Sequence, residues 1–178
     1  MLKKIVLCSS VLVLSAYAAD NISTVKNSIA NYDKSITIGQ AFDKWKQCDS
    51  TKWENFATDN GKKVVQYTCQ MDSYGKKLQK QAILELEERI ASDKKYLKTS
   101  TFKELEERRI KALEEKIPKI KTKLFTKVLV QWIINVDNTI DFAYSGVVIQ
   151  DNGSMNNMSY DTYKLLADVY QNNYLTFK

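Results

Sequence analysis

The 178-residue chain contains no histidine. Histidine is the most common general base and the most common metal ligand in proteins. Its absence therefore excludes Ser-His and Cys-His nucleophile pairs and histidine-based metal sites. Carboxylate pairs and a Ser-Lys pair survive this test, but neither leaves a recognisable local signature in the sequence. Composition therefore predicts no enzyme activity, no resident metal and no cofactor.

Proline and glycine are also scarce, with one Pro and five Gly. Flexible and extended linkers are rich in these residues, and we find no internal repeat or low-complexity tract. Once a leader segment is removed, about 160 residues remain, a length that suits one domain. We therefore predict a single domain over residues 19–178.

The leader is residues 1–18, which have the three parts of a secretory signal peptide. Lys3 and Lys4 give a positive start, a short apolar run follows, and Ala16 and Ala18 form the small-residue pattern of a cleavage site. The apolar run is shorter than the roughly 20 residues of a membrane-spanning helix. We predict cleavage near Ala18 and an exported protein, periplasmic or secreted.

Cysteine occurs three times, and Cys8 lies inside the predicted leader. Cys48 and Cys69 remain, and an even count in an oxidising compartment favours a disulfide between them. Two buried thiols are the alternative. With both cysteines oxidised, no thiolate is left for nucleophilic catalysis or zinc binding.

Charge is distributed unevenly along the chain. Residues 76–127 hold 16 basic and 9 acidic side chains, a net charge of +7. Such a segment attracts anionic lipid, an anionic envelope polymer or an acidic envelope protein, whereas nucleic acid is not expected outside the cytoplasm. A merely solvated helical face is the alternative interpretation.

The same region has the pattern of two amphipathic helices, a helical arm predicted over residues 76–117. Apolar residues recur every three or four positions on both sides of an interruption at 98–101. Thr101 and Glu104 predict a capping box for the second helix, and Pro118 predicts its end at or before Ile117. One long helix is the alternative, and the pair either projects or packs back on the sheet.

If the arm projects, it offers basic side chains to an anionic partner. The candidate partner-binding residues are Lys94, Lys95, Arg108, Arg109 and Lys111. The arm also carries the obvious carboxylates, at Glu85, Glu87, Glu88, Glu104, Glu106 and Glu107. Their spacing among lysines suits ion pairs on solvated faces, whereas general acid catalysis needs burial or a like-charged neighbour in a cleft.

The rest of the chain predicts two hairpins and two helices. A helix capped by Thr37 and Gln40 precedes a hairpin that turns at Asn60-Gly61, with Thr58 opposite Lys63. Residues 119–136 and 140–149 predict a second hairpin, 151–157 a loop, and Ser159 the cap of a last helix. The predicted fold class is α+β, an antiparallel sheet of about four strands with helices on one face.

Several short motifs resemble a recurring domain of small exported bacterial proteins and lipoproteins that has no assigned activity. They are Thr37-Ile38-Gly39-Gln40-Ala41-Phe42, Trp53, Asp59-Asn60-Gly61-Lys62-Lys63-Val64-Val65-Gln66-Tyr67, Val130-Gln131-Trp132-Ile133-Ile134-Asn135 and Leu166-Ala167-Asp168-Val169-Tyr170-Gln171-Asn172-Asn173. The element order is also loosely similar to outer-membrane-assembly lipoproteins and to beta-lactamase inhibitor protein. The resemblance implies export and fold, and those fold relatives bind other proteins.

Three functions remain open from the sequence. The first is a non-catalytic module that binds an envelope protein or an anionic envelope polymer through the arm or an exposed sheet face. The second is a carrier with a pocket for a small ligand or lipid between sheet and helices. The third is a carboxylate-based hydrolase of cell-wall glycan, which a cleft with paired, buried carboxylates would favour.

Overall fold

The computed structural model describes residues 21–175, so the predicted signal peptide and its cleavage site lie outside the described residues. Residues 21–27 form a helix. The elements that follow it are α2 (Ile38–Asp43), β1 (Ser50–Ala57), β2 (Lys63–Gln70), α3 (Asp72–Leu97), α4 (Lys103–Glu114), α5 (Lys116–Lys121), β3 (Lys123–Ile134), β4 (Ile140–Asp151), β5 (Ser154–Ser159) and α6 (Thr162–Tyr170).

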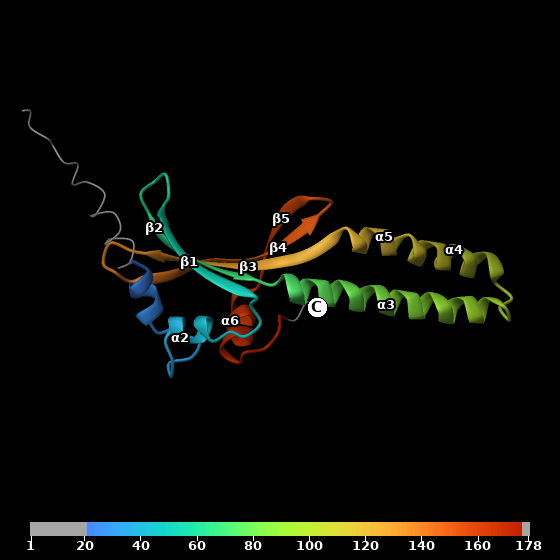
Figure 1. The fold of residues 1–178 in the computed structure, drawn as a ribbon, viewed down its shortest axis with the longest axis horizontal. Helices are drawn as coiled ribbons and strands as arrows, with labels where there is room; N and C mark the ends of the chain where they lie inside the picture. The colour runs from blue at the N-terminus through green and yellow to red at the C-terminus, as the bar shows by residue number, and fades with distance from the viewer. Residues whose placement is uncertain (1–20, 176–178) are drawn as a thin grey trace, which may run out of the picture.

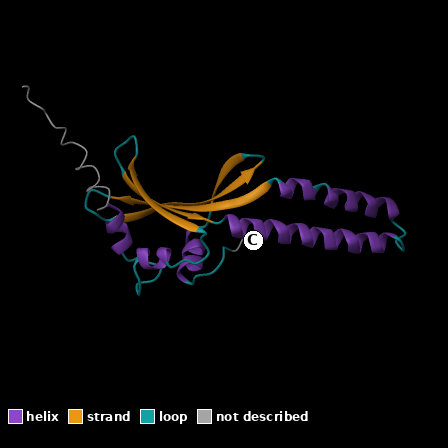
Figure 2. Cartoon of the chain, in the orientation of Figure 1, coloured by secondary structure: helices purple, strands orange, loops and turns teal. Residues whose placement is uncertain are grey.

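The predicted α+β class is confirmed, with one antiparallel sheet in the order β1-β2-β3-β4-β5. Figures 1 and 2 show α2 and α6 together on one side of the sheet. The sheet has five strands rather than about four, because β5 forms where the sequence predicted a loop. Asn152 and Gly153 both have positive φ, which allows the tight two-residue turn that pairs β5 with β4.

The first hairpin forms where predicted, but its register differs by one residue. Ala57 lies opposite Lys63, so the loop spans 58–62 and only Gly61 has a positive φ. Thr58 and Lys62 close this loop, because the Thr58 amide donates to the Lys62 carbonyl at 2.9 Å and the Lys62 amide donates to the Thr58 hydroxyl at 3.1 Å. The shift places Phe56 opposite Val64, on the face of the sheet away from the helices.

The main core lies between the sheet and its covering helices. It joins side chains of β2 and β3 to Phe42 of α2 and to Leu165 and Val169 of α6. Trp45 and Trp132 are buried, while the half-buried Trp53 stacks on Trp132 with ring centroids 5.5 Å apart. The tryptophans are therefore used for packing.

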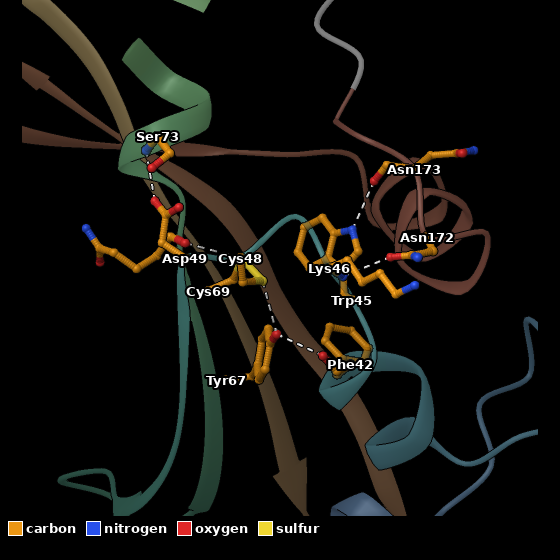
Figure 3. The surroundings of a disulfide bond; sticks show 11 residues. Phe42, Trp45, Lys46, Cys48, Asp49, Tyr67, Cys69, Ser73, Asn172 and Asn173 are labelled. Carbon is orange, nitrogen blue, oxygen red and sulfur yellow. Dashed lines mark hydrogen bonds between the residues drawn. A yellow bond between two sulfur atoms is a disulfide. The ribbon is translucent and has the colours of Figure 1, made fainter. Parts of the chain in front are cut away.

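The predicted disulfide between Cys48 and Cys69 is present and ties the segment after α2 to β2 (Figure 3). The Tyr67 hydroxyl lies 3.4 Å from the Cys48 sulfur and donates a hydrogen bond of 3.0 Å to the Phe42 carbonyl. Burial raises the pKa of Tyr67, and the negative charge of Asp43 adds to the shift. The hydroxyl therefore stays protonated and holds α2 against the sheet.

The C-terminal segment meets the same region of the structure. The Trp45 indole Nε1 donates to the Asn173 carbonyl at 2.9 Å, and the Lys46 amide donates to the Asn172 side chain at 2.8 Å (Figure 3). Asn172 has a positive φ, which turns the chain sharply after α6. The segment after α2 is thus held by the disulfide on one side and by the C-terminus on the other.

We expect replacement of both bridged cysteines, Cys48→Ser with Cys69→Ser, to lower the free energy of unfolding by about 3 kcal/mol. The bridge closes a loop across 21 positions and so restricts the unfolded chain. Urea denaturation followed by circular dichroism measures the effect, and wild type unfolded in reductant is the control. A loss below about 1 kcal/mol would show that the bridge adds little to the packed core.

Candidate functional site: the helical arm

The helical arm consists of α3, α4 and α5 and spans residues 72–121, somewhat more than the predicted 76–117. Figure 1 shows it as an antiparallel hairpin that extends well beyond the end of the sheet. At 1.5 Å per residue, the 26-residue α3 is roughly 39 Å long. Of the two arrangements that the sequence left open, the arm projects.

Of the two short sequence features at the arm's turns, the predicted capping box of Thr101 and Glu104 does not form, whereas the predicted end of the helix at or before Ile117 is confirmed. Phe102, not Thr101, precedes α4, and its amide donates to the Ser100 hydroxyl at 3.1 Å. The helix α4 ends at Glu114, ahead of Pro118, but Pro118 then lies in the first turn of α5. A proline is tolerated there because the first-turn amides have no partner within the helix.

The base of the arm is attached to the sheet at the start of α3. The Ser73 amide donates to the Asp49 carboxylate at 2.8 Å, which caps the helix from outside, since Met71 makes no side-chain cap. This hydrogen bond holds the pKa of Asp49 below its ordinary value. Gly75 lies so close to the Phe125 carbonyl that a Cβ on it would overlap the oxygen.

The two halves of the arm are also joined one turn further out. The Gln79 side-chain amide donates to backbone carbonyls on the returning chain. They belong to Ile120 at 3.0 Å, Lys121 at 3.1 Å and Lys123 at 2.8 Å. One glutamine of α3 therefore bridges the end of α5 and the start of β3.

Beyond the base, the arm has a small apolar seam separate from the main core. Its members are Ile90, Ile110 and Leu113, with Leu86, Leu97 and Ile117 packed against them. The same three-and-four spacing places Asp93 and Glu106 in the seam, and each is only 9 % exposed. Two of the seam positions are therefore acidic.

Arg109 supplies the positive charge for both seam carboxylates. Its guanidinium Nε lies 3.3 Å from Asp93, on the facing helix, and its Nη1 lies 3.7 Å from Glu106. Buried carboxylates are strongly unfavourable without such a partner. Arg109 therefore stabilises the arm, and its guanidinium is already engaged by these two carboxylates.

The structure separates the five candidate partner-binding residues into two groups. Lys94 pairs with Glu114 at 2.7 Å across the helices, Arg108 pairs with Glu104 at 2.7 Å within α4, and Arg109 is held as above. Lys95 and Lys111 are exposed. The sequence pattern identified the charges, but it did not distinguish the ones that the arm itself uses.

The candidate carboxylates divide in a similar way. Glu85, Glu87, Glu88, Glu104 and Glu107 lie on exposed helical faces, and Glu106 is buried in the seam. Glu106 and Asp93 do form a buried acidic pair, but packed helices and Arg109 enclose it. General acid–base chemistry needs a substrate within hydrogen-bond reach, which this packing does not offer.

The tip of the arm also carries large apolar side chains that the sequence patterns did not predict. Tyr96, Phe102 and Leu105 flank the turn between α3 and α4 and are 56 %, 70 % and 63 % exposed. They lie off the apolar stripe, so a search for helical periodicity passes over them. The available signal was three large apolar residues next to a turn, where polar residues are usual.

A second candidate site is a groove in the sheet body, outside the arm. It has a volume of about 400 Å³ and lies between the loop 28–32, α2, α6 and the paired ends of β3 and β4. Its walls are mainly apolar, and Ile29, Tyr32 and Tyr163 at its margin are exposed. The remaining lining residues are Ser28, Ala30, Asn31, Ile38, Phe42, Trp132, Ile140, Phe142, Thr162 and Leu166.

No protein-family model matches the chain, and no curated protein or solved structure is significantly similar to it. The resemblance to small exported proteins thus remains a hypothesis carried by the motifs. Within residues 21–175, no helix is long and apolar enough to cross a membrane. The same residues contain no group of three or more acidic or cysteine side chains placed to hold a metal ion.

Arg109→Met is expected to loosen the arm, whereas Arg108→Met is a matched control that removes the same charge one residue away. Arg109 compensates two buried carboxylates, while Arg108 forms an exposed pair that contributes little. Amide hydrogen exchange of α3 and α4 should become about tenfold faster in Arg109→Met, for a local cost of about 1–2 kcal/mol. Equal exchange in the two variants would contradict the structural role of Arg109.

Proposed function

We propose that the chain is an exported, non-catalytic binding module that holds an envelope component through its helical arm. The supporting observation is the projection of the arm beyond the sheet body (Figure 2). Basic and apolar side chains are exposed on it. An arm that served only to cover the core would lie on the sheet, whereas this one has its own seam.

Charge supports an anionic partner, which is an acidic envelope protein, an anionic envelope polymer or anionic lipid. The excess of basic side chains over residues 76–127 coincides with the arm and its return into β3. Of the five candidate residues, Lys95 and Lys111 are the two whose ammonium groups are exposed without an ion pair described above. We infer that these two contact the partner, while Lys94, Arg108 and Arg109 maintain the arm.

The experiment is crosslinking in intact cells of the source, with the full-length mature protein compared with a shortened arm. A short Gly-Ser linker in place of residues 83–117 preserves the contacts of Gly75 and Gln79 at the base. We expect a specific envelope partner to be captured by the full protein and lost from the shortened one. Thermal unfolding checks that the shortened protein still folds.

A charge-reversal pair refines the same experiment. Lys95→Glu with Lys111→Glu should reduce capture at least fivefold, because it reverses the exposed charges of the arm. Lys116→Glu with Lys119→Glu makes the same change of charge near the base and should leave capture within about twofold. If the full-length and the shortened protein capture the same partners, the binding surface lies on the sheet body and not on the arm.

The groove supports a second candidate function, a carrier for a small apolar ligand. Its volume of about 400 Å³ lies within the range of small-molecule sites, and its walls combine aromatic rings with a few polar groups. The exposed Tyr163 and Ile29 at its margin would be covered by such a ligand.

An apolar fluorophore such as 1-N-phenylnaphthylamine tests this second candidate. We expect its emission to rise with wild type and with the shortened arm, but not with Ala30→Phe, which places a ring at the groove wall. Tyr163→Ser at the margin should weaken binding only a few-fold. Binding that persists in Ala30→Phe would place the fluorophore elsewhere and remove this candidate.

A further inference from the structure

The tip of the arm combines exposed apolar side chains with an uninterrupted run of positive charge. Residues 94–103 hold four lysines and no acidic residue. Of the acidic groups on either side, Asp93 pairs with Arg109 and Glu104 with Arg108, whereas Glu107 is exposed. The tip therefore has an apolar surface at Tyr96, Phe102 and Leu105, with a net positive charge around it.

We propose that this tip docks on an anionic lipid surface. Phe102, Leu105 and the ring of Tyr96 enter the headgroup region, and lysine ammonium groups contact the lipid phosphates. The contacting lysines are Lys95, Lys98 and Lys103, all exposed. This inference rests on the proposed function and names the chemistry of the partner.

The composition of the tip favours lipid over a protein partner. Protein interfaces are enriched in arginine and depleted of lysine, and their strongest contacts fill fitted pockets. Residues 94–103 contain lysine and no arginine. Long lysine stems lie along apolar surface while their ammonium groups stay in water, which suits the boundary of a bilayer.

The shape of the molecule favours the same partner. The turn between α3 and α4 lies at the far end of the arm from the sheet (Figure 1), so it can contact a flat surface while the sheet body stays clear of it. A stable protein interface buries about 800 Å² on each side. A narrow, convex turn suits instead the insertion of a few large side chains into an interface that deforms around them.

Co-sedimentation of the mature full-length protein with vesicles tests the proposal. The vesicles contain about 30 mol % phosphatidylglycerol in phosphatidylcholine, with pure phosphatidylcholine as the neutral comparison. We expect binding to the anionic vesicles, at least tenfold weaker binding to neutral ones, and release at high salt. The salt dependence follows because ions screen exposed charges.

Two lysine variants with the same loss of charge locate the binding surface. Lys95, Lys98 and Lys103 are changed to Gln at the tip, and Lys116, Lys119 and Lys121 to Gln near the base. Each lysine near an anionic surface contributes about fivefold to partitioning, so the tip variant should bind on the order of 100-fold more weakly. The base variant should change binding less than about threefold, because its charges lie more than a Debye length from the lipid.

A third variant tests the apolar part of the contact. Phe102→Ser with Leu105→Ser removes two exposed side chains, so the fold is preserved, and binding should fall at least tenfold. An environment-sensitive fluorophore on Thr99→Cys should shift to the blue with anionic vesicles only. Equal losses in the tip and base lysine variants, or no binding to anionic vesicles, would overturn the proposal.

The outcomes separate this inference from the proposed function. If vesicles do not bind but the crosslinked partner is still lost with the shortened arm, the lipid inference is wrong and an acidic protein partner is favoured. If the protein with the shortened arm still binds vesicles and still captures the partner, both proposals are wrong. If the tip variants lose vesicle binding and the base variant keeps it, the result supports docking of the tip on anionic lipid.

Discussion

The fold depends on the junction where the arm leaves and re-enters the sheet. The arm leaves through β2 and returns through β3, which are hydrogen-bonded neighbours, with Gln70 opposite Lys127. It is therefore a long connection of an antiparallel strand pair, and its two ends are held side by side before any helix packs. Backbone contact between Gly75 and Phe125 requires the smallest residue at this point, so the direction of the arm is set by main-chain geometry.

Farther out, the arm stabilises itself only modestly. Its seam has few buried apolar side chains, and two positions that would complete it are Asp93 and Glu106. Acidic residues in a seam weaken it, but they also restrict how the helices align, because Arg109 meets both carboxylates in one register only. Stability at the base and alignment in the seam together position Tyr96, Phe102 and Leu105 at the tip, which take no part in either.

The elements with strong local chemistry were predictable from the sequence. The capping box of Thr37 and Gln40 forms as expected, and so do the disulfide and the helical pair. The fifth strand was missed although Asn152-Gly153 repeats the turn signal recognised at Asn60-Gly61. The strand it introduces is exposed along its whole length, and its apolar residues Met155 and Met158 are three positions apart, so it lacks the alternation by which strands are recognised. The last helix begins at Thr162 and is capped by Asp161, whose carboxylate accepts from the Lys164 amide; the predicted cap, Ser159, is part of the fifth strand instead.

The candidate site was predictable only in outline. Net charge along a sequence identified the arm, but ion pairing between helices depends on which faces meet. Lys94 and Glu114 are 20 positions apart and are brought together only by the fold. The groove joins segments from both ends of the chain, such as Tyr32 and Tyr163, and so has no local sequence pattern.

The placement of the aromatic rings has a spectroscopic consequence. Trp45, Trp53 and Trp132 all belong to the sheet body, and the arm beyond its base has only Tyr96 and Phe102 as aromatic side chains. Tryptophan fluorescence therefore reports on the sheet body and does not respond to local changes at the tip of the arm. The two parts of the molecule can be followed separately in one sample, with an introduced dye at the tip and the native indoles in the sheet.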